Sequence, residues 1–260
     1  MFISETYAYC NGLRHVHPGE KGLFFILTLF IALVNKSLLI SLVLAGFIMA
    51  VLVAKARIPL LTILGFMLIP AGFVFLSLVM LVLSITREAS GGLVLGAWAG
   101  YYLVISYSGI WLAKTVLAKV IGSLTSMIFL LFTTPLVDLM ALLHRLKVPG
   151  IFLELMVLTY RFIFVFLETA GQIYRAQEAR CGFTTRSSAF RALRLLIVNL
   201  FTKTLHRSRQ LTLGLAGRGY RGVLLVPKEL PPLSVSHLLG IVVFVLVLGI
   251  IVLGAAGGVL

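Results

Sequence analysis

The stretch IPLLTILGFMLIPAGFVFLSLVMLVLSI, residues 58–85, contains no charged residue. A helix of about 20 apolar residues crosses the hydrocarbon core of a bilayer, so this stretch predicts a transmembrane helix. Pro59 suits the first turn of such a helix, and Arg87 and Glu88 follow its end. The fold is therefore that of a membrane protein.

The composition of the whole chain supports this interpretation. Of its 260 residues, 60% are hydrophobic and 12% are charged, whereas soluble domains have about 45–50% apolar and about 25% charged residues. These values exclude a water-soluble globule, and they exclude a disordered chain, which needs low hydrophobicity. In this hydrophobic chain, 22 basic and 8 acidic residues give a net charge of +14. Where these basic residues lie along the chain is the main question.

Other apolar segments lie on both sides of residues 58–85. Residues 22–54 are apolar except at Asn35-Lys36-Ser37, which predicts either a tight helical hairpin or one broken span. Residues 91–132 are interrupted only by Lys114 and Lys119, which predicts two spans or one long helix with a lysine face against protein.

Three features complete the membrane part. Thr133-Thr134-Pro135 breaks the apolar run, a short amphipathic segment follows, and further spans are expected at about 150–169 and 235–253. We expect an all-α polytopic membrane protein with five to seven transmembrane helices and additional cytoplasmic amphipathic helices.

The expected organisation has four parts. Residues 1–21 are a polar N-terminal segment without the pattern of a signal peptide, and residues 22–169 contain transmembrane helices. Residues 170–222 are a basic cytoplasmic segment of coupling helices, and residues 223–260 are a linker with a C-terminal transmembrane helix.

Most of the positive charge lies in residues 175–221. This segment has ten basic residues and one acidic residue, a net +9 of the total +14: Arg175, Arg180, Arg186, Arg191, Arg194, Lys203, Arg207, Arg209, Arg218, Arg221 and Glu178. Positive residues near span ends favour the cytoplasmic side. We expect two or three helices along the membrane face, with Ser187-Ser188 as an N-cap. Contact with anionic lipid and docking of an acidic soluble partner both remain open, whereas no nucleic-acid module is visible.

Two short motifs favour a protein partner. Ala179-Arg180-Cys181 is expected to end a helix that starts near Thr169, and Gly217-Arg218-Gly219 is expected to end a second helix. An arginine at a helix C-terminus also suits the helix dipole, which alone would explain either motif. Small neighbours leave each guanidinium free to enter a partner's pocket.

Ionisable residues also occur within the span at 150–169. Glu154, Arg161 and Glu168 are seven residues apart and share one face of a helix. Because charge is costly at membrane depth, an internal ion-pair face is expected, with a proton relay or a subunit contact as alternatives. His15 and His17 are two possible metal ligands without a third, so no metal site is expected.

Several of these motifs resemble a known family. His17-Pro18-Gly19-Glu20-Lys21, Thr133-Thr134-Pro135, Leu158-Thr159-Tyr160-Arg161-Phe162, residues 175–180 and Ala216-Gly217-Arg218-Gly219 occur in an order similar to the transmembrane T component of energy-coupling factor (ECF) transporters, the EcfT/CbiQ family. The opening Tyr7-Ala8-Tyr9 with His15 and His17 resembles the cobalt-type branch.

This resemblance implies a function. In the family, arginines of two Ala-Arg-Gly-like motifs dock into two ABC-type ATPases at the ends of cytoplasmic coupling helices, which also cradle a substrate-binding membrane S component. The corresponding residues are Arg180 and Arg218, with Cys181 in place of the usual glycine and Gly182 expected to supply the turn. The resemblance implies cobalt uptake for cobalamin biosynthesis at the bacterial inner membrane, with nickel or a vitamin as alternative substrates.

No catalytic site or cofactor is expected in this chain. It has no G-x-x-x-x-G-K-[ST] phosphate loop, so ATP hydrolysis would be supplied by partners. The alternative from a different class is a self-contained secondary transporter that uses the Glu154, Arg161 and Glu168 face.

Overall fold

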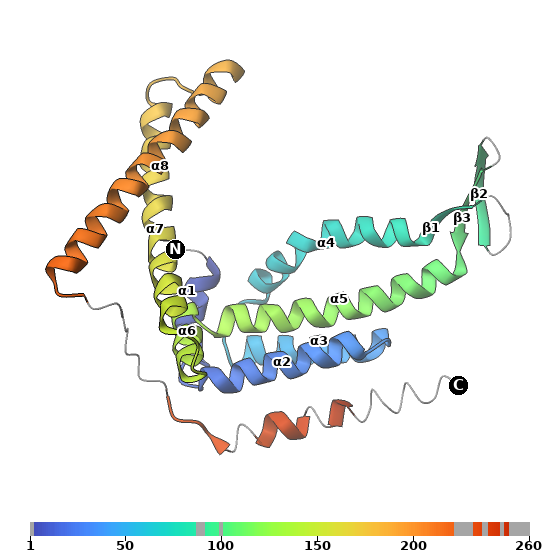
Figure 1. The fold of residues 1–260 in the computed structure, drawn as a ribbon. Coiled ribbons are helices and arrows are strands. Elements are labelled where there is room, and N and C mark those ends of the chain that lie inside the picture. The colour runs from blue at the N-terminus through green and yellow to red at the C-terminus, as the bar shows by residue number, and fades with distance from the viewer. Residues whose placement is uncertain are drawn as a thin grey trace. The chain divides into compact units, whose positions relative to one another are not determined.

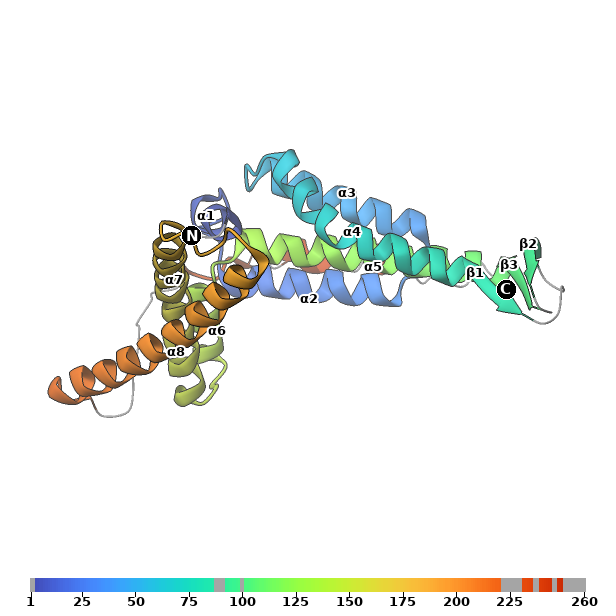
Figure 2. The same ribbon diagram turned by 90° about the horizontal axis from the view of Figure 1, so that it is seen from above.

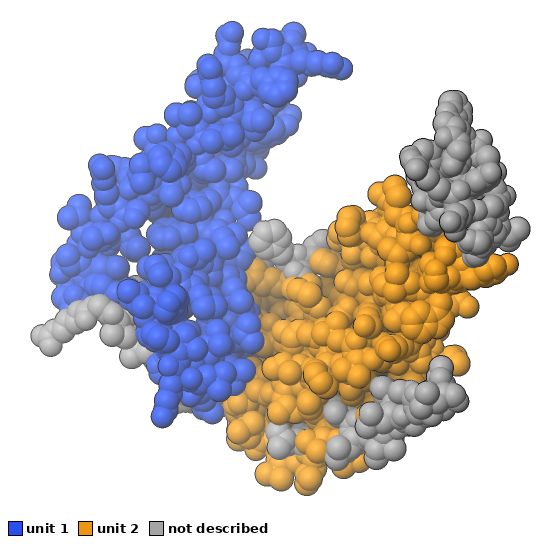
Figure 3. All heavy atoms as spheres, turned by 45° about the vertical axis from the view of Figure 1, so that its right-hand side comes forward, with its two compact units in different colours: residues 1, 136–229 blue, residues 2–135, 230–260 orange. Residues whose placement is uncertain are grey.

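A computed structural model describes residues 3–86, 92–98, 101–220, 231–235, 239–244 and 247–249. The chain forms two compact units (Figure 3): residues 136–229 make up nearly all of unit 1, and residues 2–135 with 230–260 make up unit 2. Helices dominate both, which confirms the predicted all-α membrane class. Arg87, Glu88, Arg221 and Gly222, which the sequence singled out, lie outside the described residues.

Unit 2 is built around one long helix, α5. Four other helices pack against it, as Figures 1 and 2 show from two directions. The elements of this unit are α1 (Ile3–Cys10), α2 (Pro18–Val34), α3 (Leu38–Ala54), α4 (Leu60–Val82), β1 (Leu83–Thr86), β2 (Gly92–Trp98), β3 (Tyr101–Ser106) and α5 (Tyr107–Thr133).

Small and hydroxyl residues allow α5 to occupy this central place. Gly122 lies so close to α2 that a Cβ there would be 2.7 Å from the Cβ of Ala32. The buried hydroxyls of Thr125 and Ser126 donate to carbonyls one turn back, at 2.7 and 2.8 Å. These bonds satisfy polar groups within the helix itself, and small residues permit the close helix contacts that are typical of membrane proteins.

The break in the first apolar region gives two separate helices. Asn35 is the C-cap of α2 and has an extended backbone conformation. Its side-chain amide donates to Ser41 Oγ at 2.9 Å. The hairpin was one of the two predictions for residues 22–54, and the observed α2 and α3 match it, each packed against α5.

The region after α4 differs from its prediction. The three strands Leu83–Thr86, Gly92–Trp98 and Tyr101–Ser106 form a small antiparallel sheet with strand order β1-β3-β2, in which Leu83 and Leu93 both pair with Ile105. The apolar run from residue 91 is therefore neither two spans nor one helix, because α5 begins only at Tyr107. Its first part is rich in β-branched and aromatic residues, which favour strands. Lys114 and Lys119 both lie within the continuous helix α5.

Unit 1 consists of three helices, α6 (Leu136–Arg145), α7 (Gly150–Glu178) and α8 (Arg186–Gly217). The predicted helix start near Thr169 was wrong, because α7 runs unbroken from the apolar segment to Glu178. The predicted N-cap at Ser187-Ser188 was also wrong. Thr185 is the N-cap of α8 and forms a capping box with Ser188.

Within the described part of the chain, three helices are long and apolar enough to cross a membrane: α4, α5 and α7. Two shorter apolar helices are α3 and residues 239–249, the second running over residues that are not described. The count of five to seven spans stays a prediction, as does the four-part division of the chain. In the expected C-terminal span, 235–253, residues 236–238, 245–246 and 250–253 lie outside the described residues.

Candidate functional site

The first arginine motif forms the C-terminal cap of α7. The chain leaves the helix through Cys181, whose backbone φ of 56° is in the left-handed region. Its N–H donates to the carbonyl of Glu178, and the N–H of Gly182 donates to the carbonyl of Gln177, both at 2.9 Å. This pair of bonds is a Schellman motif, which satisfies carbonyls at a helix end. The turn is therefore made by Cys181 itself, and Gly182 supplies the second N–H.

The second arginine motif ends α8 in the same way. Gly219 has a φ of 71°, and its N–H donates to the carbonyl of Ala216 at 3.1 Å. The N–H of Tyr220 donates to the carbonyl of Leu215 at 3.0 Å. These are the two bonds of a Schellman motif at the C-terminal end of the helix.

The two arginines are consequently equivalent in local geometry. Arg180 and Arg218 each directly precede the residue with positive φ, and both side chains are exposed. The flanking small residues singled out by the sequence are exposed as well: Ala179, Cys181, Gly217 and Gly219. The structure thus presents two matched guanidinium groups at exposed helix ends.

The two motifs lie near opposite ends of α8. This helix has 32 residues, which corresponds to a length of about 48 Å. Gly182 lies against the first turns of α8, since a Cβ at Gly182 would be 3.5 Å from the Cβ of Ala192. Figure 1 shows α8 following α7 after a short loop, within unit 1. A partner that held both arginines would have to offer two separated sites.

We predict that two neighbouring substitutions at the first turn have opposite effects on stability. In Gly182→Ala, the new Cβ would lie 2.9 Å from the carbonyl oxygen of Gln177, so we expect a loss of about 1–3 kcal/mol. In Cys181→Gly, the release of about 1–2 kcal/mol of left-handed strain is partly offset by about 0.5–1 kcal/mol of backbone entropy. Thermal unfolding in detergent, followed by circular dichroism, measures both, and equal melting of the two variants would contradict the assigned turn.

Glu154 has a hydrogen-bond partner that the sequence did not suggest. The hydroxyl of Tyr220, which directly follows the second turn, donates a hydrogen bond to Glu154 Oε1 on α7. Arg161 and Glu168 are exposed on the same helix. The ion-pair face therefore stays a prediction, and Glu154 instead connects the end of α8 to the first part of α7.

The Tyr220 contact predicts a response to alkaline pH. The hydrogen bond to Glu154 raises the pKa of the Tyr220 hydroxyl above its ordinary value of 10.0, because only the protonated phenol can donate. The stabilising bond is complete below pH 10 and is lost as pH rises through the raised pKa. In an ultraviolet titration of phenolate, the component missing from Tyr220→Phe should titrate last, and Glu154→Leu should lower its midpoint. An unchanged midpoint in Glu154→Leu would contradict the bond.

Two motifs that carry the family resemblance meet inside unit 2. The ammonium group of Lys21 donates to the carbonyl of Thr133 at 2.9 Å, and the Asn11 amide donates to the carbonyls of Phe132 and Thr133 at 3.1 and 3.3 Å. Together they satisfy carbonyls at the C-terminus of α5, a role that suits a lysine. Asn11 was missed from the sequence, because nothing local indicates which distant carbonyl it binds.

His17 has a structural role at the start of α2. The Nδ1 atom of His17 accepts from the N–H of Gly19 at 2.9 Å, so its ring caps α2, which begins with Pro18. In the described part of the chain, no three His, Cys, Asp or Glu side chains are grouped to hold a metal ion. The absence of a resident metal stays a prediction.

Comparisons with known proteins agree with these features. A family model described as cobalt transport protein, CbiQ, matches residues 11–229. The cobalt transport protein CbiQ of Salmonella typhimurium is 30% identical over 222 residues, 84% of this chain and 96% of that protein. An uncharacterised protein of Methanocaldococcus jannaschii is 30% identical over 242 residues, 93% of this chain and 89% of that protein. A putative fused cobalt transport protein CbiMQ of Methanocorpusculum labreanum is 30% identical over 129 residues, 50% of this chain and 22% of that protein.

Apolar helices of bilayer length, joined to helices with exposed basic ends, define a polytopic helical membrane protein. The family match extends from residue 11 through both arginine motifs to residue 229. The chain belongs to the CbiQ family of cobalt transport proteins, and it is a membrane component of cobalt transport.

Proposed function

We propose that this chain is the coupling subunit, the T component, of an ECF-type importer for cobalt. Two ABC-type ATPase subunits would bind its two arginine turns from the cytoplasm, and a substrate-binding membrane subunit would lie against its coupling helices. The observation that carries this proposal is the equivalence of Arg180 and Arg218, two exposed guanidinium groups in identical turns. Two copies of one ATPase would offer two identical pockets to such a pair.

The continuity of α7 supports a mechanism. Arg180 directly follows α7, the helix that contains the apolar segment starting at Gly150, so a force on its guanidinium acts directly on that long helix. Arg218 ends α8, and the Tyr220 hydrogen bond links that end to Glu154 of α7. ATP-driven approach of two ATPases would therefore move both ends of the helix pair, and thereby any subunit that rests on it.

Exposed apolar side chains on α8 support a membrane partner. Large uncovered apolar surfaces mark contacts with protein or lipid, and α8 exposes Phe190, Leu193, Ile197, Phe201 and Leu213. One relative is named as a fused CbiMQ protein, which favours a neighbouring membrane component. The basic residues of α8 favour the cytoplasmic side of the bacterial inner membrane.

Purification of the tagged chain from its native membrane tests this proposal. We expect two ATP-binding subunits and a second, smaller membrane protein to copurify, and cobalt uptake by the reconstituted complex to need ATP. Cobalt uptake by this chain alone in liposomes, without an ATPase, would overturn the proposal and favour the self-contained transporter.

A further inference from the structure

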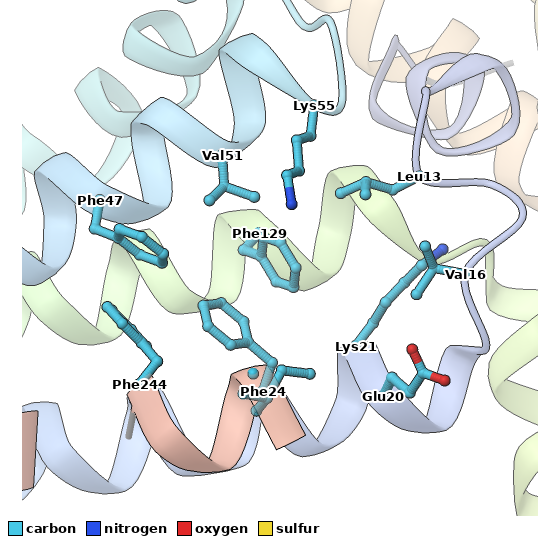
Figure 4. Close-up of a pocket in the computed structure, with 12 residues that line it drawn as sticks. Leu13, Val16, Glu20, Lys21, Phe24, Phe47, Val51, Lys55, Phe129 and Phe244 are labelled. Carbon is cyan, nitrogen blue, oxygen red and sulfur yellow. The ribbon is translucent and has the colours of Figure 1, made fainter. Parts of the chain in front are cut away.

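A pocket of about 330 Å³ opens in unit 2, away from the arginine turns. It lies between the start of α2, the end of α3, α5 and residues 240–244 of the C-terminal segment (Figure 4). Ligand pockets in proteins measure about 300–1,000 Å³, so this pocket is large enough for part of a ligand.

The walls of the pocket are aromatic. The rings of Phe47 and Phe244 stack with centroids 4.0 Å apart, and the ring of Phe24 meets that of Phe129 edge-on at 4.8 Å. Val51 and Ile241 add aliphatic surface. Such a lining favours a hydrocarbon occupant over water, because ordered water needs polar partners.

The mouth of the pocket carries positive charge. Figure 4 shows Lys55 reaching from the end of α3 over the pocket, on the side of Phe129, and its side chain is exposed. Lys21 and Glu20 also line this end, and Glu20 Oε1 accepts the N–H of Ser234 at 2.7 Å. Two lysines against one glutamate leave a net positive mouth, which favours an anionic group.

The charged mouth and the apolar wall follow one face of α3. Phe47, Val51 and Lys55 are four residues apart, so they lie one above the other along about 12 Å of helix. An occupant with its charge at Lys55 would extend inward along Val51 to Phe47. This order of charge and hydrocarbon is that of a membrane lipid.

The position of the mouth agrees with such an occupant. It lies where α2 begins and α3 ends. In the sequence, Arg14 precedes α2 and Arg57 follows α3, whereas the connection between the other ends of these two helices contains one basic residue, Lys36. Basic residues favour the cytoplasmic side, whose lipids include anionic ones.

We propose that this pocket binds one acyl chain of an anionic phospholipid, with the phosphate held at Lys55. The acyl chain lies against Phe24, Phe47, Phe129 and Phe244, and residues 240–244 hold it against the helices. This inference does not rest on the coupling role, and it concerns a lipid built into unit 2 rather than lipid at the basic surface of α8.

Photolabelling of the purified full chain tests this inference. Phosphatidylglycerol with a diazirine in its acyl chain is expected to label peptides that contain Phe24, Phe47 or Phe244. Lys55→Glu should reduce this labelling at least about fivefold. The matched control is Lys36→Glu, an exposed lysine at the opposite end of α3, which should leave the labelling unchanged.

A second variant keeps the test decisive if Lys55→Glu does not fold. Ile241→Trp fills the pocket without a change of charge and should reduce labelling to a similar extent. Equal labelling of these peptides by a phosphatidylcholine analogue, competition by inorganic phosphate alone, or full labelling of either pocket variant would overturn the proposal.

Discussion

Reversal of charge at both Arg180 and Arg218 is expected to abolish copurification of the ATPase subunits while the membrane chain stays folded. Both side chains are exposed and lie in turns held by backbone bonds, so the substitutions remove no packing. An arginine at the centre of an interface contributes about 2 kcal/mol or more, so the double variant should bind roughly a thousandfold more weakly. Arg180→Glu and Arg218→Glu alone should each give an intermediate loss.

A matched variant separates docking from general electrostatics. Lys203→Glu with Arg207→Glu changes the net charge by the same amount at two exposed positions in the middle of α8, away from both turns. ATPase binding, measured by pull-down from detergent, should survive this change. Equal loss in both double variants would mean that bulk charge is responsible, and unchanged binding in both would mean that the two arginines serve only as helix caps.

Gly122→Ala is expected to destabilise unit 2 by about 1–3 kcal/mol, the usual cost of overpacking. The new Cβ would lie 2.7 Å from the Cβ of Ala32, which is fully buried on α2. The two nearest atoms are the Cβ and Cα of Ala32, which are fixed by the backbone of α2. No flexible side chain can therefore move aside. The expected result is a lower midpoint of thermal unfolding in detergent.

The control for this substitution is Gly46→Ala on α3. Gly46 is also helical, but a Cβ there meets nothing within 4 Å. Alanine is favoured over glycine in a helix by about 0.5–1 kcal/mol, so Gly46→Ala should be neutral or stabilising. If both variants shifted the midpoint in the same direction, the close contact of α2 with α5 would be contradicted.

The two arginine turns were predictable from the sequence only in part. The residue types at Arg180 and Arg218 already indicated exposed helix ends, and the structure places both there. The sequence did not predict which residue of the first turn has positive φ. Glycine adopts positive φ easily and cysteine rarely does, so the sequence analysis assigned the turn to Gly182. Only the two backbone bonds at Gln177 and Glu178 assign that conformation to Cys181.

The membrane region shows a different limit. Hydropathy located α4 and α7 closely, because burial in lipid depends on composition over many residues. It failed at residues 92–98 and 101–106, where apolar segments of similar composition form strands, since hydropathy does not distinguish strand from helix over short stretches. The bond of Lys21 to Thr133 and the Phe-lined pocket join residues more than a hundred positions apart.

By itself the sequence determined the membrane class, the concentration of positive charge between residues 175 and 221, and the two arginine motifs, since each depends on composition or on neighbours in the chain. Only the tertiary structure decided that α7 runs unbroken from Gly150 to Glu178, that Tyr220 bonds Glu154, and that Lys55 covers an apolar pocket. The physical reason is that long helices bring distant residues together through packing, and packing depends on which faces meet rather than on any local pattern.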